Sequence, residues 1–467
     1  MYECPNCGGN LKFEIASQKL ACTYCEGRFD PYSIKKNTDA VENNFINDDF
    51  FEVTVFACPQ CGGELFSEDN EATTFCSFCG ASTILSGRLG REKRPDFIIP
   101  FKKTKEDCKK AYAKKMRKAF FVPKALRDAS CIDEFRGIYM PYWTYQLIQK
   151  GEVLLKGEKT YRRGDYVYTE RYDLSGKLDS YYLGYSYDAS TSFYDNISEA
   201  LAPYDAKELV PFSPAFLSGF YADTADVPPE MYMQDAMEKA EENTFRKICK
   251  EDAFKACKIK RPQSRRQGLG TSLRKADNTM YPVWFLTYRN KDRVAYMTVN
   301  GQTGKVVADM PIDPKRYLAA SLLLALPIFL ILNLFLTLRP GVLLGVSAVL
   351  AVASAVIYGL ELNEINKREY HLDDRAFQGK RAQGKSRQSK EGGGGFWGKF
   401  SLHAVICAAA VFLAVIIAFV RPVSDIYYDT GALAGLGAVL FNMIEVIKNY
   451  NRLAMRRLPQ FDKKEAA

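Results

Sequence analysis

Eight cysteines in the first 79 residues form four C-x2-C pairs. Fourteen residues separate the pairs within each half, and the second half repeats the first at an offset of 54 residues. A C-x2-C turn places two sulfurs on one side of a tight loop, and two such turns can complete a tetrahedral four-sulfur site. The pattern predicts two metal sites, one formed by Cys4, Cys7, Cys22 and Cys25 and the other by Cys58, Cys61, Cys76 and Cys79.

Each spacer between paired turns is long enough for a short β-hairpin, which would bring its two turns together. The segments typical of strands are Leu11–Ile15 and Lys19–Ala21 in the first spacer, and Glu64–Ser67 and Thr73–Phe75 in the second. The Gly-Gly that follows the opening pair of each half allows the positive φ that such a turn needs. We therefore expect two small β ribbons, at residues 1–35 and 53–90, joined by a linker at 36–52.

Zinc is the metal that these ribbons favour, with one ion in each. All-cysteine tetrahedral sites are characteristic of structural zinc, and a ribbon of about 25 residues is too small to fold without the free energy of metal binding. A redox dithiol, iron and disulfides are the alternatives. A redox pair would need a thioredoxin-like βαβ frame around a single C-x2-C. The N-terminus lacks the features of a secretory signal peptide, which disfavours disulfides.

The other cysteines and the histidines are too scattered to suggest a further site. His371 and His403 are the two histidines of the chain, so most chemistry that depends on an imidazole base is hard to build. We therefore predict that the protein is not an enzyme and has no catalytic residues. Five cysteines have no partner at ligand spacing and are interpreted as ordinary thiols in a reducing compartment: Cys108, Cys131, Cys249, Cys257 and Cys407.

The 467 residues have a near-average composition that conceals a divided chain. With 47% hydrophobic and 25% charged residues, the chain is not mostly disordered or collagen-like. The mean hydropathy is −0.22, yet the C-terminal third contains four apolar runs of the kind that cross a bilayer as helices. The four runs are Tyr317–Leu338, Gly341–Leu360, Ser401–Val420 and Gly431–Ile447. They predict two transmembrane helical hairpins, at 317–360 and 401–447.

Basic residues predict the orientation of these hairpins. Lys and Arg are concentrated before the first run, in the polar, Gly-rich 361–400 loop and in the 448–467 tail, whereas the 421–430 link has one base against two acids. By the positive-inside rule, we expect the loop and both termini in the cytoplasm. Part of the loop, at 376–395, is expected to be disordered. Glu445 and His403 lie near run ends, where their side chains are expected to reach the membrane surface.

Residues 96–316 are typical of an α+β cytoplasmic domain. Helices are expected at Lys105–Ala119 and Pro229–Lys250, with tyrosine-rich strands between them. Asn300 and Gly301 open a turn between two strands, which indicates a hairpin. The nearby Gly-Gln-Thr-Gly-Lys string lacks the spacing of a phosphate-binding loop. The fold class is therefore multidomain, with two zinc ribbons, an α+β domain and a four-helix transmembrane region.

The domain contains a pseudo-repeat. Ile99-Pro100-Phe101 precedes the first helix and Val210-Pro211-Phe212 precedes the second, and each helix is followed by an aromatic Pro-x-Trp strand that ends at Trp143 or Trp284. A duplicated α+β unit would explain this order. The alternative is independent use of proline at strand starts and of tryptophan as a core filler.

Basic residues also cluster at Lys102–Lys118 and Lys258–Lys275. They suit contacts with phosphates of anionic lipid headgroups or of nucleic acid. A solvated helix face beside an anionic membrane is the simpler interpretation. The ribbons themselves have no basic face and include several acidic residues, which argues against nucleic acid.

The chain resembles a bacterial family of membrane proteins that contain TFIIB-type zinc ribbons. The resemblance extends over residues 1–312, and some members look like components of envelope-stress operons that encode PspA-type membrane-remodelling proteins. It implies a membrane-associated adaptor in the bacterial inner membrane and supplies no catalytic residues. Some relatives are labelled helicase-like. That label does not apply to this chain, because its sequence has no Walker A loop. The matching segments are 4–9, 58–63, 98–101, 137–143, 281–285 and 299–305.

Two functions from different classes fit these observations. The first is a membrane-anchored adaptor or scaffold, whose zinc ribbons present a cytoplasmic surface to other membrane or membrane-associated proteins. The second is a membrane-tethered nucleic-acid-binding protein, which the acidic ribbons make the weaker hypothesis.

Overall fold

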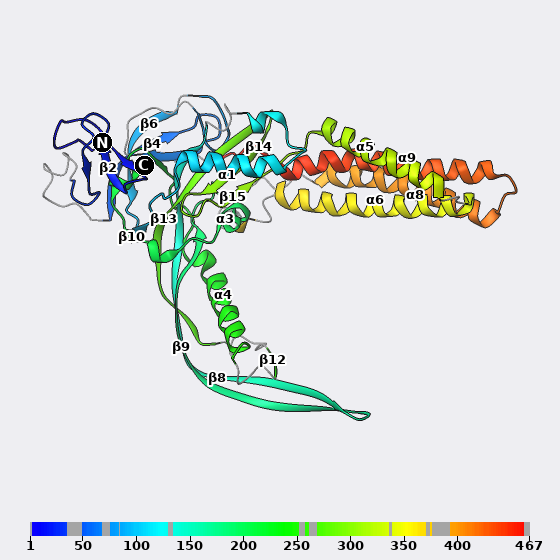
Figure 1. Ribbon diagram of the computed structural model, residues 1–467, viewed down its shortest axis with the longest axis horizontal. Coiled ribbons are helices and arrows are strands. Elements are labelled where there is room, and N and C mark those ends of the chain that lie inside the picture. Colours follow the sequence, from blue (N-terminus) through cyan, green and yellow to red (C-terminus); the bar gives the residue numbers. More distant parts are fainter. Residues whose placement is uncertain are drawn as a thin grey trace.

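The computed structural model has a sheet-rich body at one end, long helices at the other and a two-stranded arm that projects from the body (Figure 1). Several predicted features lie wholly or largely outside the described residues: the 36–52 linker, the strand at 73–75 and the 376–395 segment. Cys131 and His371 also lie outside them. The structure describes residues 2–34, 49–67, 75–83, 85–128, 134–251, 257–260, 269–335, 339–369, 374–375 and 393–461.

The first cysteine region forms a small antiparallel sheet of its own. Strands β1 (Leu11–Glu14) and β2 (Lys19–Cys22) form the predicted hairpin, with Leu11 opposite Cys22. A short β3 (Arg28–Phe29) pairs with β2 on its other side. Leu11 and Leu20 are fully buried, so alternating residues of the hairpin face the body. This sheet lies at the end of the molecule opposite the apolar helices (Figure 1).

The second cysteine region is built into the main sheet. Strand β5 (Glu64–Ser67) pairs with β4 (Phe50–Ala57), and β4 pairs with β6 (Ser86–Lys93). Strand β5 joins these three strands to the rest of the main sheet, because its Phe66 pairs with Ala222 of β11 (Tyr221–Ala222). The two cysteine regions therefore have the same motif and different attachments.

Two long antiparallel strands form the centre of the body. Strand β8 (Arg136–Arg163) pairs with β13 (Thr271–Asn290), and each makes a further hairpin, with β9 (Tyr166–Asp188) and β14 (Arg293–Asn300) respectively. Thirteen strands of the described residues belong to this sheet. The remaining short strands are β7 (Phe97–Ile98), β10 (Val210–Pro211), β12 (Lys258–Lys260), β15 (Val306–Ala308) and β16 (Arg456–Arg457).

Helices lie on different parts of this sheet. The predicted helices are confirmed as α1 (Lys105–Lys118), which opens with a Thr104 capping box, and α4 (Glu230–Ile248). Helix α1 buries Tyr112 and Met116, and α3 (Asp195–Leu201) packs in the cluster that contains the second cysteine group. The predicted Asn-Gly hairpin is also confirmed by β14 and β15. Short 3-10 turns are η2 (Lys124–Arg127), η3 (Ala206–Glu208) and η4 (Pro214–Leu217).

The pseudo-repeat has a structural basis that differs from the predicted match. Each tryptophan donates its indole N–H to the loop before the helix of the other half: Trp143 to the carbonyl of Val227 (2.7 Å) and Trp284 to that of Lys103 (2.8 Å). Strand β7 runs parallel to β13, and β11 runs parallel to β8. The counterpart of β7 is therefore β11. Val210-Pro211-Phe212, which the sequence matched to Ile99-Pro100-Phe101, lies at β10, and β10 pairs antiparallel with β7. A duplication stays a prediction.

Within the described residues, four helices are long and apolar enough to cross a membrane. They are α5 (Pro314–Phe335), α6 (Pro340–Glu369), α8 (Gly393–Val420) and α9 (Asp425–Ala454). Buried small residues from α6, α8 and α9 pack together, which allows close approach of these helices. The apolar window of α5 has 0% of its residues buried, so α5 is not part of this packed group.

A polar network lies inside the packed helices. His403 is buried, with Nδ1 2.9 Å from Oδ1 of Asn442, whose Nδ2 donates to Oγ of Ser354 and to Sγ of Cys407, both at 3.0 Å. The expectation that His403 reaches the membrane surface was therefore wrong, because its ring has a hydrogen-bond partner between helices. Glu445, by contrast with His403, forms an ion pair with Lys448 on the same helix.

An arginine cluster joins the helices to the body. Glu369, the last residue of α6, makes ion pairs with Arg293 of β14 (3.3 Å), Arg452 of α9 (2.9 Å) and Arg457 of β16 (2.9 Å). Strand β16 follows α9 directly and pairs with β14. Within the predicted 448–467 tail, α9 therefore continues to Ala454, and Arg456–Arg457 joins the body sheet.

Candidate metal centres

All four C-x2-C turns have the same backbone hydrogen bonds. In each, the N–H of the first cysteine donates to the carbonyl five residues later, and the N–H four residues later donates back to the carbonyl of that cysteine, at 2.7–3.1 Å. The residue four positions on has positive φ in all four turns. That residue is Gly8, Gly62 or Gly80 in three turns and Glu26 in the other. The glycines that follow the opening pairs thus have the predicted role.

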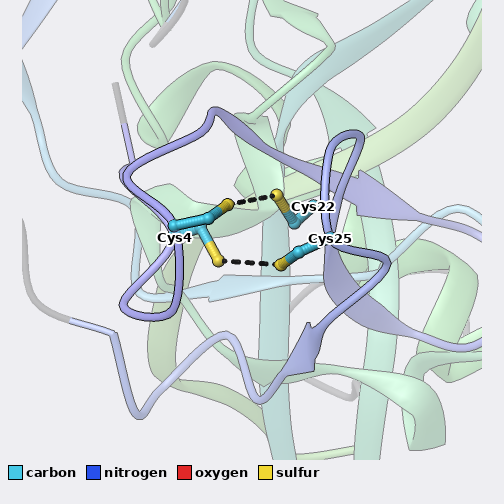
Figure 2. A group of neighbouring side chains, drawn as sticks. Cys4, Cys22 and Cys25 are labelled. Carbon is cyan, nitrogen blue, oxygen red and sulfur yellow. Dashed lines mark hydrogen bonds between the residues drawn. The ribbon is translucent and has the colours of Figure 1, made fainter.

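The first cluster brings together the four predicted cysteines of the N-terminal ribbon. Sγ of Cys4 is 3.5 Å from Sγ of Cys25, and Sγ of Cys7 is 3.5 Å from Sγ of Cys22. Figure 2 shows the side chains of the two turns pointing toward one another. All four sulfurs lie within 4.8 Å of one another.

The second cluster has the same arrangement with slightly longer spacings. Sγ of Cys58 is 3.8 Å from Sγ of Cys79, and Sγ of Cys61 is 3.7 Å from Sγ of Cys76. A disulfide would bring two sulfurs to about 2 Å, and every described cysteine is free. Zinc–sulfur bonds of about 2.3 Å in a tetrahedron separate the sulfurs by about 3.8 Å. Both clusters therefore fit one tetrahedral ion and have no open coordination position for substrate.

Backbone N–H groups favour the thiolate form that a metal ion requires. The pKa of Cys22 falls to about 6 because the N–H groups of Cys25 and Tyr24 point at its sulfur. The pKa of Cys58 also falls to about 6, first through the thiol of Cys76 and then through two backbone N–H groups. Backbone N–H groups that donate to a sulfur stabilise its thiolate form.

The first cluster is open to solvent on one side. Cys4 and Cys22 are buried, whereas Cys7 and Cys25 are exposed, and the neighbouring Tyr24 is 79% exposed. The ribbon is attached to the body through the strand side. The N–H of Phe13 donates to the carbonyl of Ser218 at 3.0 Å, and the rings of Phe13 and Phe216 are 5.2 Å apart.

The second cluster is enclosed by the body, and all four of its cysteines are buried. The Tyr296 hydroxyl donates to the carbonyl of Phe78 at 2.7 Å, and the Thr287 hydroxyl donates to the carbonyl of Ser77. These hydroxyls come from β14 and β13. Strands β13 and β14 therefore hold the loop between Cys76 and Cys79 through these two hydrogen bonds.

The chain segment after the last apolar helix also covers the second cluster. The N–H of Phe461 donates to the carbonyl of Cys61 at 2.7 Å, and its ring meets Phe78 edge-on with centroids 5.5 Å apart. Sequence reasoning missed this residue, since a lone phenylalanine in a basic tail carries no motif. The outcome is a continuous connection from α9 through β16 to the cysteine turn.

Comparison with known proteins gives one informative similarity. No protein-family model matches the chain, and no solved structure matches it. The chain is similar to "Uncharacterized protein YdjG" of Bacillus subtilis (strain 168), with 29% identity over 325 residues. The match covers 67% of this chain and 90% of that protein. The similarity therefore extends over most of the relative and two thirds of the present chain.

Proposed function

We propose that the protein is a membrane-anchored adaptor of the bacterial inner membrane, with an exposed zinc ribbon that binds partner proteins in the cytoplasm. The observation that carries this proposal is the placement of the first cysteine cluster. Its outer turns are open to solvent at the end of the molecule farthest from the apolar helices (Figure 1). A rigid, metal-bound turn with an exposed aromatic side chain is a suitable protein-binding surface.

Zinc is the ion we propose for both clusters. The donor set is four sulfurs with tetrahedral spacing, which suits zinc and leaves no position for catalysis. When bound, zinc would crosslink the two turns of each cluster. Metal analysis of purified protein should give two zinc ions per chain, and iron or a metal-free protein would contradict this assignment.

The cytoplasmic orientation of the body is also part of the proposal. Basic residues occur where helices meet the body, including Arg316 at the start of α5, Arg368 at the end of α6 and Arg452 at the end of α9. The 421–424 link at the opposite end has a single arginine. By the positive-inside rule, this distribution supports a body that lies in the cytoplasm. Protease protection in sealed inverted and right-side-out vesicles measures this directly.

Crosslinking in native membranes tests the adaptor role. Tyr24→Ala removes the exposed aromatic side chain beside the first cluster without removing a ligand, and Leu89→Ala is a control at an equally exposed site on β6 (85% exposed). We expect specific neighbouring proteins to be lost from the Tyr24→Ala sample and kept in the control, while both variants retain two metal ions. An identical set of neighbours in both variants and in the unmodified chain would contradict the proposal. A partner from the envelope-stress response would support the more specific role that the sequence resemblance suggests.

A further inference from the structure

The long β8–β9 hairpin extends beyond the body as an arm, and its end packs against no other element among the residues that the structure describes. Every residue from 159 to 173 is exposed. A two-stranded hairpin with water on both faces is only marginally stable, so this stretch gains little from its own fold. The tip contains three exposed tyrosines and two adjacent arginines, in the sequence Tyr-Arg-Arg-Gly-Asp-Tyr-Val-Tyr at 161–168.

The register places aromatic and basic side chains on one face of the tip. Tyr161 lies opposite Tyr168, and Arg163 lies opposite Tyr166. Opposite residues share a face, and so do residues two apart along a strand. The three tyrosines and Arg163 therefore line the same face. The rings of Tyr161 and Tyr168 stack with centroids 5.5 Å apart, which leaves Tyr166, at 72% exposure, at the extreme end.

The other face of the tip has the same character. It carries Arg162 and Val167, which are opposite each other, and Val167 is 66% exposed. Neither Arg162 nor Arg163 forms an ion pair with any residue that the structure describes. Between residues 159 and 168 there are three basic side chains and one acid, Asp165. The tip is thus aromatic with a net positive charge, and Glu170, two residues beyond it, accepts a hydrogen bond from the Tyr161 hydroxyl at 3.0 Å.

The direction of the arm matches this chemistry. Figure 1 shows the arm curving toward the side on which the apolar helices extend, so that its tip lies beyond the ends of the helices nearest the body. If the helices span a bilayer, an arm that extends past these helix ends is long enough to reach the membrane surface that faces the body. Tyrosine is enriched at that depth, and lysine and arginine are attracted to anionic headgroups.

We propose that the tip of the arm, residues 159–168, binds the anionic surface of the bilayer that contains the helices. The tyrosines and Val167 enter the headgroup layer, and Arg162 and Arg163 contact lipid phosphates. The arm would then be a second, reversible membrane contact that fixes the tilt of the body. This inference rests on the membrane anchoring proposed above.

Hydrogen exchange of the full chain in lipid nanodiscs tests the arm contact. One set contains phosphatidylcholine alone and the other adds phosphatidylglycerol. We expect exchange at 159–168 to be about tenfold slower in the anionic nanodiscs at low salt, and to recover at high salt because the contact is electrostatic. Exchange in β6 should be the same in both sets.

Two variants give the result a matched control. Arg162→Glu with Arg163→Glu should abolish the protection, whereas Arg91→Glu, an exposed charge reversal on β6, should leave it unchanged. Equal exchange of the tip in the two nanodiscs would overturn the arm contact, as would protection that requires added nucleic acid or protein. A chain that does not enter nanodiscs would overturn the membrane anchoring itself, so the two failures are distinguishable.

Discussion

The two cysteine clusters have the same spacing, the same turn hydrogen bonds and similar sulfur distances, but their surroundings differ. The first has two exposed cysteines and a three-stranded sheet of its own, while the second is fully buried in the main sheet. The second is also held by Tyr296 of β14, Thr287 of β13 and Phe461 in the segment after α9.

Because of this difference, we expect metal binding to stabilise different parts of the molecule at the two clusters. Metal binding contributes folding free energy to whatever structure the ligands organise. At the first cluster that structure is a small ribbon, and loss of the ion would unfold a local unit. At the second cluster the structure includes β13, β14 and the segment that leaves the membrane helices, so loss of the ion would loosen the body as a whole. The four predictions below test this distinction.

Removing one ligand from each cluster should give the largest contrast. Cys61→Ser leaves three ligands in the buried site, and we expect it to lower the free energy of unfolding of the body by more than about 3 kcal/mol. Cys7→Ser should affect only the N-terminal ribbon. Hydrogen exchange in β13 and β14 of purified protein measures both effects, with Cys249→Ser as the control for loss of a thiol outside the clusters. Equal exchange in the two ligand variants would show that both clusters are local.

Metal release to a coloured chelator should occur in two phases. The exposed cluster can open locally, whereas the buried one must first separate from the strands that cover it, so the two rates should differ by at least about tenfold. Absorbance of the chelator complex reports both phases, and Cys7→Ser should remove the fast one. A single phase with two equivalents of metal would contradict the comparison.

Phe461→Ala tests whether the segment after α9 protects the buried cluster. Its ring packs on Phe78, and removal of a partly buried phenylalanine side chain costs about 2 kcal/mol. We expect the slow phase of metal release to accelerate by about tenfold or more and the fast phase to remain unchanged. The control is Phe120→Ala, since Phe120 is 76% exposed. Acceleration of both phases to the same extent would show a general loss of stability instead.

The sequence predicted the chemistry of both clusters more fully than their surroundings. Cysteine spacing is a local property, so the eight proposed ligands group as two sets of four in the structure. Contacts between distant segments leave no such local signal. The hydrogen bond from Phe461 to Cys61 joins residues 400 positions apart, and the second cysteine region joins the main sheet through the pairing of β5 with β11.

The apolar helices also combine features that the local sequence predicted with contacts that it did not predict. Their existence was predictable from uncharged runs of membrane-spanning length. The partners of their polar residues were not, because His403 and Asn442 are 39 positions apart and meet only when α8 packs on α9. The repeat was found from Pro and Trp, but strand pairing was needed to identify β11 as the counterpart of β7.

Glu26→Gly should give the smallest effect and the opposite sign. Glu26 has φ of 56°, at the position that is glycine in the other three turns. A side chain in this region costs about 1 kcal/mol, so relief of strain should slow the fast phase of metal release about fivefold and leave the slow phase unchanged. Glu26→Ala controls for the lost charge and should not slow release. The reverse change, Gly8→Ala (φ 73°), adds a Cβ that meets nothing within 4 Å and should accelerate the fast phase by a similar factor. If Glu26→Ala slows release as much as Glu26→Gly, charge rather than backbone conformation limits the exposed cluster.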